Sequence, residues 1–126
     1  MKSYTDIEQS KKLTEILSPE SADMYYEPSA GFRTEPSEAK FGDIEYAHPR
    51  SIRCWSLAAL LDVLPKEIEI DEQHYAPCLF PIKSKWLLKL WYNSNYTFTS
   101  PISIFSDNPV DACVEMVLKL HELKLL

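Results

Sequence analysis

Apolar residues at helical spacing predict a helix near the N-terminus, over about residues 5–17. Its apolar stripe consists of Ile7, Leu13, Ile16 and Leu17. Thr5 and Glu8 have the spacing of a capping box at the start of this helix, and Ser18-Pro19 ends it. The same proline suits the first position of a short second turn, which is predicted to run toward Ala22-Asp23-Met24-Tyr25-Tyr26.

A long irregular segment is predicted at about residues 27–50. Both glycines of the chain and three of its prolines lie there among scattered charges, and this mixture breaks either periodicity. Loops longer than about 12 to 15 residues are uncommon unless they are mobile or functional. We therefore expect the segment either to lie partly extended along the domain or to form a lid.

A broad apolar stripe before Pro65 predicts a central helix over about residues 54–64. The stripe consists of Trp55, Leu57, Ala58, Leu60, Leu61 and Leu64. Asp62 is the only charged residue between Cys54 and Leu64, so little of this helix can face water. Cys54 is therefore expected at the beginning of a buried helix.

After Pro65 the apolar period changes to two residues, which predicts strands. Ile68 and Ile70 alternate with carboxylates that we expect on the wet side of a short strand. These carboxylates belong to Glu67, Glu69, Asp71 and Glu72. A longer strand follows, and one of its faces is lined by Trp86, Leu88, Leu90 and Tyr92. Its opposite face is lined by Leu87, Lys89 and Trp91.

Asn93-Ser94-Asn95 predicts a hairpin loop after the longer strand, because asparagine tolerates positive φ better than most residues. The partner strand begins at Tyr96 and runs to Phe105, so Trp86–Tyr92 and Tyr96–Phe105 are predicted to pair antiparallel. Pro101 places the second strand at an edge or at a bulge, because proline has no N–H to donate.

Strong start signals predict a C-terminal helix from Pro109 to about Leu123. Asn108 suits the cap, and Asp111 in the first turn complements the helix dipole. The inner stripe consists of Val110, Cys113, Val117 and Leu120, widened by Met116 and Leu123. N-terminal, central and C-terminal helices packed with a mostly antiparallel sheet predict an α+β fold. A chain of 126 residues fits one domain over residues 1–126.

Composition narrows the class of protein. A hydrophobic fraction of 45% beside 25% charged residues is typical of a packed globular protein. The net charge of -6 has the wrong sign for general nucleic-acid binding. No apolar run approaches the roughly 20 residues of a membrane span, and the N-terminus shows no signal-peptide pattern. We therefore expect a soluble cytoplasmic protein that does not cross a membrane.

Three widely spaced cysteines, Cys54, Cys78 and Cys113, are unlike a disulfide framework and are interpreted as reduced thiols. Cys54-Trp55 at the start of a helix could create a nucleophile, and papain-like peptidases place Cys-Trp there. The rest of their local signature is missing, and no Asn or Asp can be identified to orient His74 or His121. Burial of Cys54 as a small apolar residue is the more common role.

Metal and nucleotide sites are not predicted. Zinc-compatible atoms occur in His48, Cys54, His74, Cys78 and Cys113. Structural zinc sites usually show two tight pairs, and only His74-x3-Cys78 forms even one loose pair on a turn or loop. Two glycines cannot supply a glycine-rich phosphate loop. We expect no cofactor and, under native conditions, no stoichiometric zinc.

Leu87 and Trp91 are the candidate binding residues. Several aromatic residues of the strand region could form either sheet core or a binding surface, and core is the more common outcome. Trp91, however, lies on the strand face opposite Trp86. A face that carries Leu87 and Trp91 leaves an apolar patch that the first helix, the irregular segment, another protein or a second copy must cover.

Three segments carry a resemblance to a known set of proteins: Ala22-Asp23-Met24-Tyr25-Tyr26, Cys54 through Leu61, and Asp111-Ala112-Cys113 through Leu126. In these segments the chain resembles small uncharacterised proteins of gut-bacterial genomes, often encoded in phage-like or mobile regions. The resemblance covers about half of the chain and implies a phage or mobile-element setting, but no catalytic residue.

The sequence favours a non-enzymatic cytoplasmic module that binds another protein or associates with itself, in a phage or mobile-element setting. One alternative is a small thiol-dependent enzyme that uses Cys54 with a histidine. The other is an acidic decoy that occupies a nucleic-acid-binding protein, which would need carboxylates at phosphate-like spacing on one face. The enzyme requires an exposed Cys54 beside a base, and the binding module requires an apolar patch on the surface.

Overall fold

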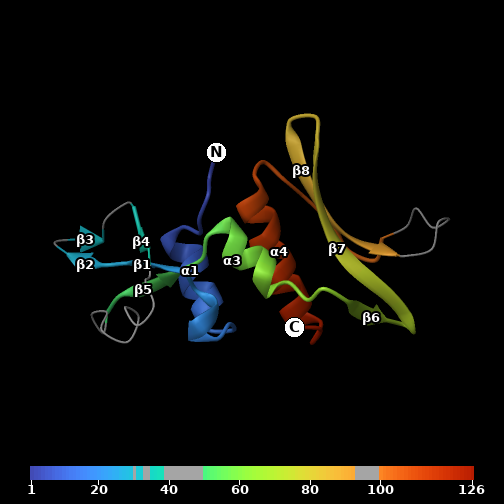
Figure 1. Ribbon diagram of the computed structural model, residues 1–126, viewed down its shortest axis with the longest axis horizontal. Helices are drawn as coiled ribbons and strands as arrows, with labels where there is room; N and C mark the ends of the chain where they lie inside the picture. The colour runs from blue at the N-terminus through green and yellow to red at the C-terminus, as the bar shows by residue number, and fades with distance from the viewer. Residues whose placement is uncertain (30, 33–34, 39–49, 93–99) are drawn as a thin grey trace. The chain divides into compact units, whose positions relative to one another are not determined.

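The computed structural model describes residues 1–29, 31–32, 35–38, 50–92 and 100–126 (Figure 1). The chain divides into two compact units, Ser3–Asp62 and Met1–Lys2 with Val63–Leu126. Helices and antiparallel sheets together confirm the predicted α+β class. The single domain over residues 1–126 stays a prediction. No helix among the described residues is both long enough and apolar enough to cross a membrane.

The first unit begins with helix α1, Ile7–Thr14, which is shorter than predicted and has a different cap. Asp6 caps it: the Asp6 carboxylate accepts from the Gln9 backbone N–H at 2.8 Å, and the Gln9 side chain accepts from the Asp6 N–H at 3.1 Å. The predicted box of Thr5 and Glu8 is therefore wrong by one residue. The physical reason is that Thr5 is fully buried, with its hydroxyl engaged elsewhere.

A 3₁₀ turn, η1 (Pro19–Ser21), confirms the predicted turn at Pro19, but the chain then enters strand β1, Met24–Tyr26. β1 pairs antiparallel with β4, Ser37–Glu38, and with β5, Ile52–Cys54. Two further short strands, β2 (Pro28–Ser29) and β3 (Gly31–Phe32), pair with each other. The segment predicted as irregular thus carries short strands, and its residues 30, 33–34 and 39–49 lie outside the described part of the chain.

The central helix α3 covers Leu57–Val63 and does not include Cys54, which corrects the sequence interpretation. Cys54 ends β5, where it lies opposite Met24 of β1, so its backbone belongs to a sheet. Ser56 precedes the helix, and its hydroxyl accepts from the Ala59 N–H at 3.1 Å, as a capping residue does. The apolar stripe of the sequence therefore begins at Trp55, before the first residue of the helix.

The second unit contains one antiparallel sheet in the order β6-β7-β8-β9. Its strands are β6 (Ile68–Ile70), β7 (Gln73–Ile82), β8 (Lys85–Tyr92) and β9 (Ser103–Ser106). Leu87 lies opposite Phe105 and Lys89 opposite Ser103, which confirms the predicted antiparallel pairing for this part of the two segments. The predicted Asn93-Ser94-Asn95 loop and the beginning of its partner strand lie outside the described residues.

Strand β7 is not predicted by the sequence, because Pro77 and Pro81 argue against a strand interior. The register explains how both prolines are tolerated. The Leu90 N–H donates to the Ile102 oxygen at 3.1 Å, so Leu90 directs its backbone groups toward β9 and away from Pro77, which lies opposite. Pro81 lies opposite Trp86, whose backbone groups point toward β9 as those of Leu90 do. β6 pairs with Gln73–Tyr75 in the described residues, so neither proline nitrogen faces a partner strand.

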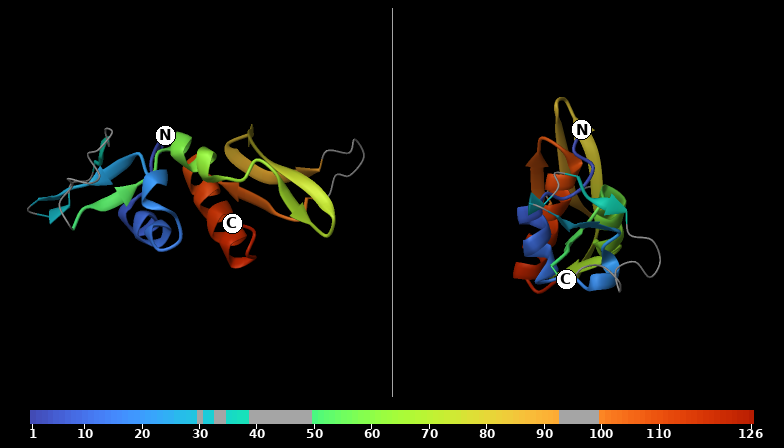
Figure 2. Two further views of the ribbon diagram at one scale, coloured as in Figure 1. Left: turned by 60° about the horizontal axis from the view of Figure 1, so that its bottom comes forward. Right: turned by 90° about the vertical axis from the view of Figure 1, so that its left-hand side faces the viewer.

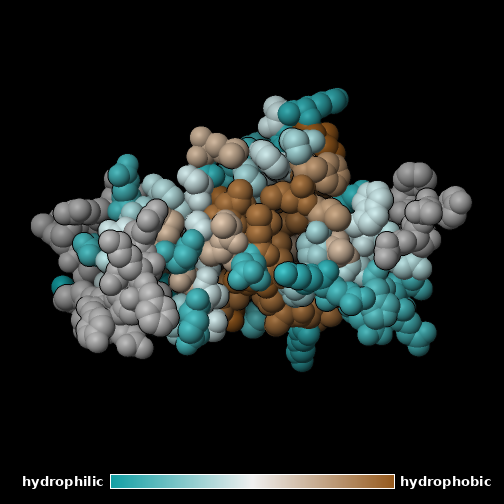
Figure 3. All heavy atoms as spheres, viewed as in Figure 1, coloured by the Kyte–Doolittle hydropathy of each residue, from teal (hydrophilic) through white to brown (hydrophobic). Residues whose placement is uncertain are grey.

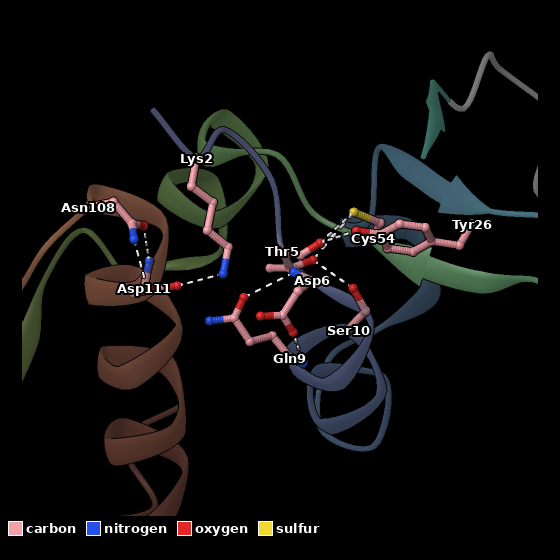
Figure 4. Close-up of polar contacts among 9 residues, drawn as sticks. All are labelled: Lys2, Thr5, Asp6, Gln9, Ser10, Tyr26, Cys54, Asn108 and Asp111. Atoms are coloured by element: carbon pink, nitrogen blue, oxygen red, sulfur yellow. Dashed lines mark hydrogen bonds and ion pairs between the residues drawn. The ribbon is translucent and has the colours of Figure 1, made fainter. Parts of the chain in front are cut away.

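Helix α4, Pro109–Glu122, has the predicted start: the Asn108 side chain accepts from the Asp111 N–H at 2.8 Å. Lys2 donates to the Asp111 carboxylate at 2.8 Å (Figure 4). The helix packs on β8 and β9 and lies along one face of the sheet (Figure 2). Leu88 and Leu90, which alternate with outward-facing residues, are buried on that face. The helix therefore determines which face of the sheet is core.

The carboxylates around β6 lie on the wet side of the sheet, as predicted. Glu67, Glu69, Asp71 and Glu72 are all exposed. Figure 3 shows hydrophilic residues gathered over β6 and the adjoining end of β7. Asp71 and Glu72 form the two-residue loop between these strands, with φ of 50° and 68°. Two consecutive positive φ values match the turn whose twist suits an antiparallel hairpin.

Candidate functional site

The face of the β6–β9 sheet turned away from α4 is called the outer face here. Cross-strand partners share a face, so the register defines its members. They are Glu69 of β6, His74, Ala76, Cys78, Phe80 and Ile82 of β7, Lys85, Leu87, Lys89 and Trp91 of β8, and Ser103 and Phe105 of β9. Both candidate binding residues, Leu87 and Trp91, therefore lie on this face.

Two large aromatic side chains of the outer face are exposed. Trp91 is 48% exposed and Phe105 is 59% exposed. Leu87 is only 6% exposed, because it lies directly between Phe80 and Phe105 on the neighbouring strands. Leu87 thus supports the surface from below, whereas Trp91 and Phe105 form it. The sequence pattern did not single out Phe105, because its proximity to Leu87 depends on the strand register.

Lys89 lies between the aromatic side chains of the outer face. Its Nζ is 4.5 Å from the centroid of the Trp91 ring and 5.6 Å from that of Phe80. Both distances fall in the range in which a ring face attracts a cation. Among the described residues, Lys89 forms no ion pair with a carboxylate. Within the described part of the chain, the amine therefore lies against two ring faces and no carboxylate.

A depression of about 410 Å³ lies beside Trp91. Its lining residues are Lys66, Glu67, His74, Tyr75, Ala76 and Trp91. Glu67 Oε1 lies 2.9 Å from His74 Nδ1, so this carboxylate already has a partner. Lys66 has no ion-pair partner in the described part of the chain. The surface around Trp91 thus combines an exposed indole with two lysines that lack carboxylate partners, which suits binding rather than a covalent reaction.

Cys54, the sequence candidate for a nucleophile, lies in a buried polar cluster of the first unit (Figure 4). Its thiol donates to the Thr5 carbonyl oxygen at 3.3 Å and accepts from the Thr5 hydroxyl at 3.4 Å. The same carbonyl accepts from the Tyr26 hydroxyl at 2.7 Å. The Thr5 hydroxyl lies 2.8 Å from that of Ser10 and accepts from the Trp55 N–H at 3.1 Å. These bonds join Thr5, which precedes α1, to residues of β1, β5 and α1 and to the backbone of Trp55.

Burial raises the pKa of the Cys54 thiol, although hydrogen bonds from Thr5, Ser10 and Tyr26 lower it in part. Burial likewise raises the pKa of Tyr26, and it raises the pKa of Cys113 to about 12. A raised thiol pKa keeps the sulfur protonated near neutral pH, and the thiolate is the nucleophilic form. Among the described residues, the Cys54 thiol forms hydrogen bonds with the carbonyl oxygen and the hydroxyl of Thr5, and no histidine is its partner.

We expect Cys54 in the folded protein to alkylate much more slowly near neutral pH than the thiol of an unstructured peptide. The thiol is 0% exposed and its pKa is raised, so both access and thiolate population are low. Cys78 serves as an internal control, because it is partly exposed on β7. Peptide mass spectrometry after timed iodoacetamide treatment measures each rate. Labelling of Cys54 as fast as that of the peptide thiol would restore the enzyme hypothesis.

The loose zinc pair of the sequence does not come together. His74 and Cys78 lie on one strand, not on a turn, and four residues of strand separate their Cα atoms by about 13 Å. Zinc ligands lie about 2.0–2.3 Å from the metal, so one ion cannot bind both side chains in this geometry. The described residues contain no group of three His, Cys, Asp or Glu side chains placed to hold a metal. His48 lies outside the described residues.

In comparisons with known proteins, no protein-family model, curated protein or solved structure matches the chain.

Proposed function

We propose that the chain is a non-enzymatic protein-binding module and that the outer face of the β6–β9 sheet is its binding surface. The observation that carries this proposal is the pair of exposed aromatic side chains, Trp91 and Phe105, on a sheet whose opposite face is covered by α4. Tryptophan is enriched among residues that dominate binding energy in protein interfaces. Lys89, half-buried between the rings of Phe80 and Trp91, adds a polar group that can select among partners.

The thiol-enzyme alternative has weaker support. It requires an accessible thiol beside a base, whereas Cys54 is buried with a raised pKa and hydroxyl and carbonyl partners. The acidic-decoy alternative draws on the exposed carboxylates around β6. Glu67, one of those carboxylates, is engaged by His74 at 2.9 Å, which makes it less suited to imitate a phosphate. We also propose a cytoplasmic setting in a phage or mobile element, on the reduced cysteines and the sequence resemblance alone.

Selection from a displayed library of random peptides tests this function without a known partner. The peptides have about twelve residues, enough for an extended segment to span the sheet. Wild-type protein is the bait, and the enriched peptides are then measured against Trp91→Ser and Phe105→Ser. Each substitution is expected to weaken binding at least about tenfold, because it removes an exposed aromatic anchor.

Leu123→Ser is the matched control, because Leu123 is a similarly exposed apolar residue, at 45%, located at the end of α4. Binding of the enriched peptides to this variant should equal binding to wild type. Peptides that bind Trp91→Ser, Phe105→Ser and wild type equally would place the binding surface elsewhere and refute the proposal. Loss of binding in all three variants would refute it as well, since the effect would then not be specific to the outer face.

A further inference from the structure

We propose that the segment bound at the outer face presents a carboxylate to Lys89 beside an apolar side chain that covers Trp91. This inference rests on the proposed function and names the chemistry of the partner. The juxtaposition that carries it is an amine 4.5 Å from the centroid of an exposed indole, with no carboxylate partner for that amine in the described residues.

Covering Trp91 also covers Lys89, because the amine lies over the indole ring. A partner that removes water from this site leaves the ammonium with two ring faces only. Burial of a charge without an opposite charge is costly, and ring faces compensate that cost only in part. A partner that supplies a carboxylate avoids the penalty, whereas a purely apolar partner does not. The site therefore selects for an acidic group next to an apolar one.

The charges around Lys89 also favour an acidic partner. Lys85, two pleats away on the same face, is already paired with Asp107 at 2.9 Å. The carboxylate of Glu67 is engaged by His74, and Glu69 lies opposite His74 on β6, two strands away from β8. The surface next to Trp91 thus carries Lys66 and Lys89, which have no ion-pair partner among the described residues, on a chain whose net charge is -6. Charge complementarity favours an acidic partner segment.

A second copy of the chain is a poorer occupant of this face. An isologous contact brings the same patch of both copies together, so the surface next to Trp91, which carries Lys66 and Lys89, would face the same surface of the other copy. Like charges that are placed together while water is excluded disfavour association. The outer face therefore fits a segment of a different protein better than it fits itself.

The peptides enriched on wild-type protein provide the test, read at low and at moderate salt. They are expected to carry Asp or Glu beside a large apolar residue. Lys89→Met should weaken their binding about tenfold, since a charge-assisted hydrogen bond is lost. Lys89→Arg should retain most of the affinity. Lys85→Met is the matched control: it removes a lysine from the same strand and face, but one that Asp107 already neutralises, and its effect should be small.

The outcomes separate this inference from the function on which it rests. Enriched peptides that depend on Trp91 but lack acidic residues, or that bind Lys89→Met as well as wild type, overturn the carboxylate inference and leave the binding surface standing. Peptides that bind Trp91→Ser as tightly as wild type overturn both the inference and the proposed function. Lys89-dependent binding of a single-stranded oligothymidylate, with no acidic peptide enriched, would assign the site to nucleic acid instead. Sedimentation that shows a dimer broken by Trp91→Ser would make a second copy the occupant and contradict the inference.

Discussion

Leu88→Ala is expected to lower the free energy of unfolding by about 2–5 kcal/mol, the range for removing a buried leucine side chain. Leu88 is 0% exposed, lies opposite Leu79 and Ile104 on the neighbouring strands, and belongs to the face on which α4 packs. Truncation removes apolar contacts and leaves a cavity that the sheet and helix fill only in part. Urea unfolding followed by circular dichroism measures the change.

Trp91→Ala is the matched control for Leu88→Ala, because both residues lie on β8 and point to opposite faces. A side chain that is 48% exposed should cost less than about 1 kcal/mol when truncated, since much of its surface already contacts water. If Trp91→Ala destabilised the protein as much as Leu88→Ala does, the outer face would be core rather than a binding surface. The ratio of the two effects thus tests the assignment of the faces.

Thr5→Val is expected to lower the free energy of unfolding by about 2–4 kcal/mol, although the two side chains have nearly the same shape. The Thr5 hydroxyl accepts from the Trp55 N–H and lies 2.8 Å from the Ser10 hydroxyl, and it donates to the Cys54 sulfur. All of these groups lie in the buried cluster, so valine leaves polar atoms without partners away from water. The same urea unfolding assay measures the loss.

Thr5→Ser distinguishes the hydroxyl from the packing of the methyl group. Serine retains the hydrogen bonds and removes one methyl group, which should cost about 1 kcal/mol. If Thr5→Val were as stable as wild type, the cluster would not depend on its hydrogen bonds. The interpretation of Cys54 as part of a structural polar cluster would then lose its main support.

Elements with unbroken periodicity and explicit start signals could be predicted from the sequence. The alternation in β8 indicated a strand, and Asn108 with Pro109 indicated the start of α4. In both elements the information is local, because each pattern is determined by neighbours within a few residues. The same local rules failed at Cys54, where an apolar run continues from the end of β5 through Trp55 into α3. Burial alone does not distinguish a strand end from a helix start.

The candidate site could be predicted only in part. Trp91 was found because strand alternation places it opposite the core face. The position of Phe105 on the outer face and the contact between Lys89 and Phe80 depend on the register of β7 and β9 against β8. Local sequence patterns do not determine this register. β7 itself was hidden by Pro77 and Pro81, whose tolerance follows from the direction of backbone groups on neighbouring strands. Cross-strand neighbours are therefore the part that required the structure.

The affinity of the enriched peptides for Trp91→Ser, compared with wild type under conditions in which both are folded, tests the central claim most directly. If the outer face binds another protein, affinity should fall at least about tenfold while the free energy of unfolding changes by less than about 1 kcal/mol. Unchanged affinity in a variant as stable as wild type would contradict the claim that Trp91 is part of the binding surface.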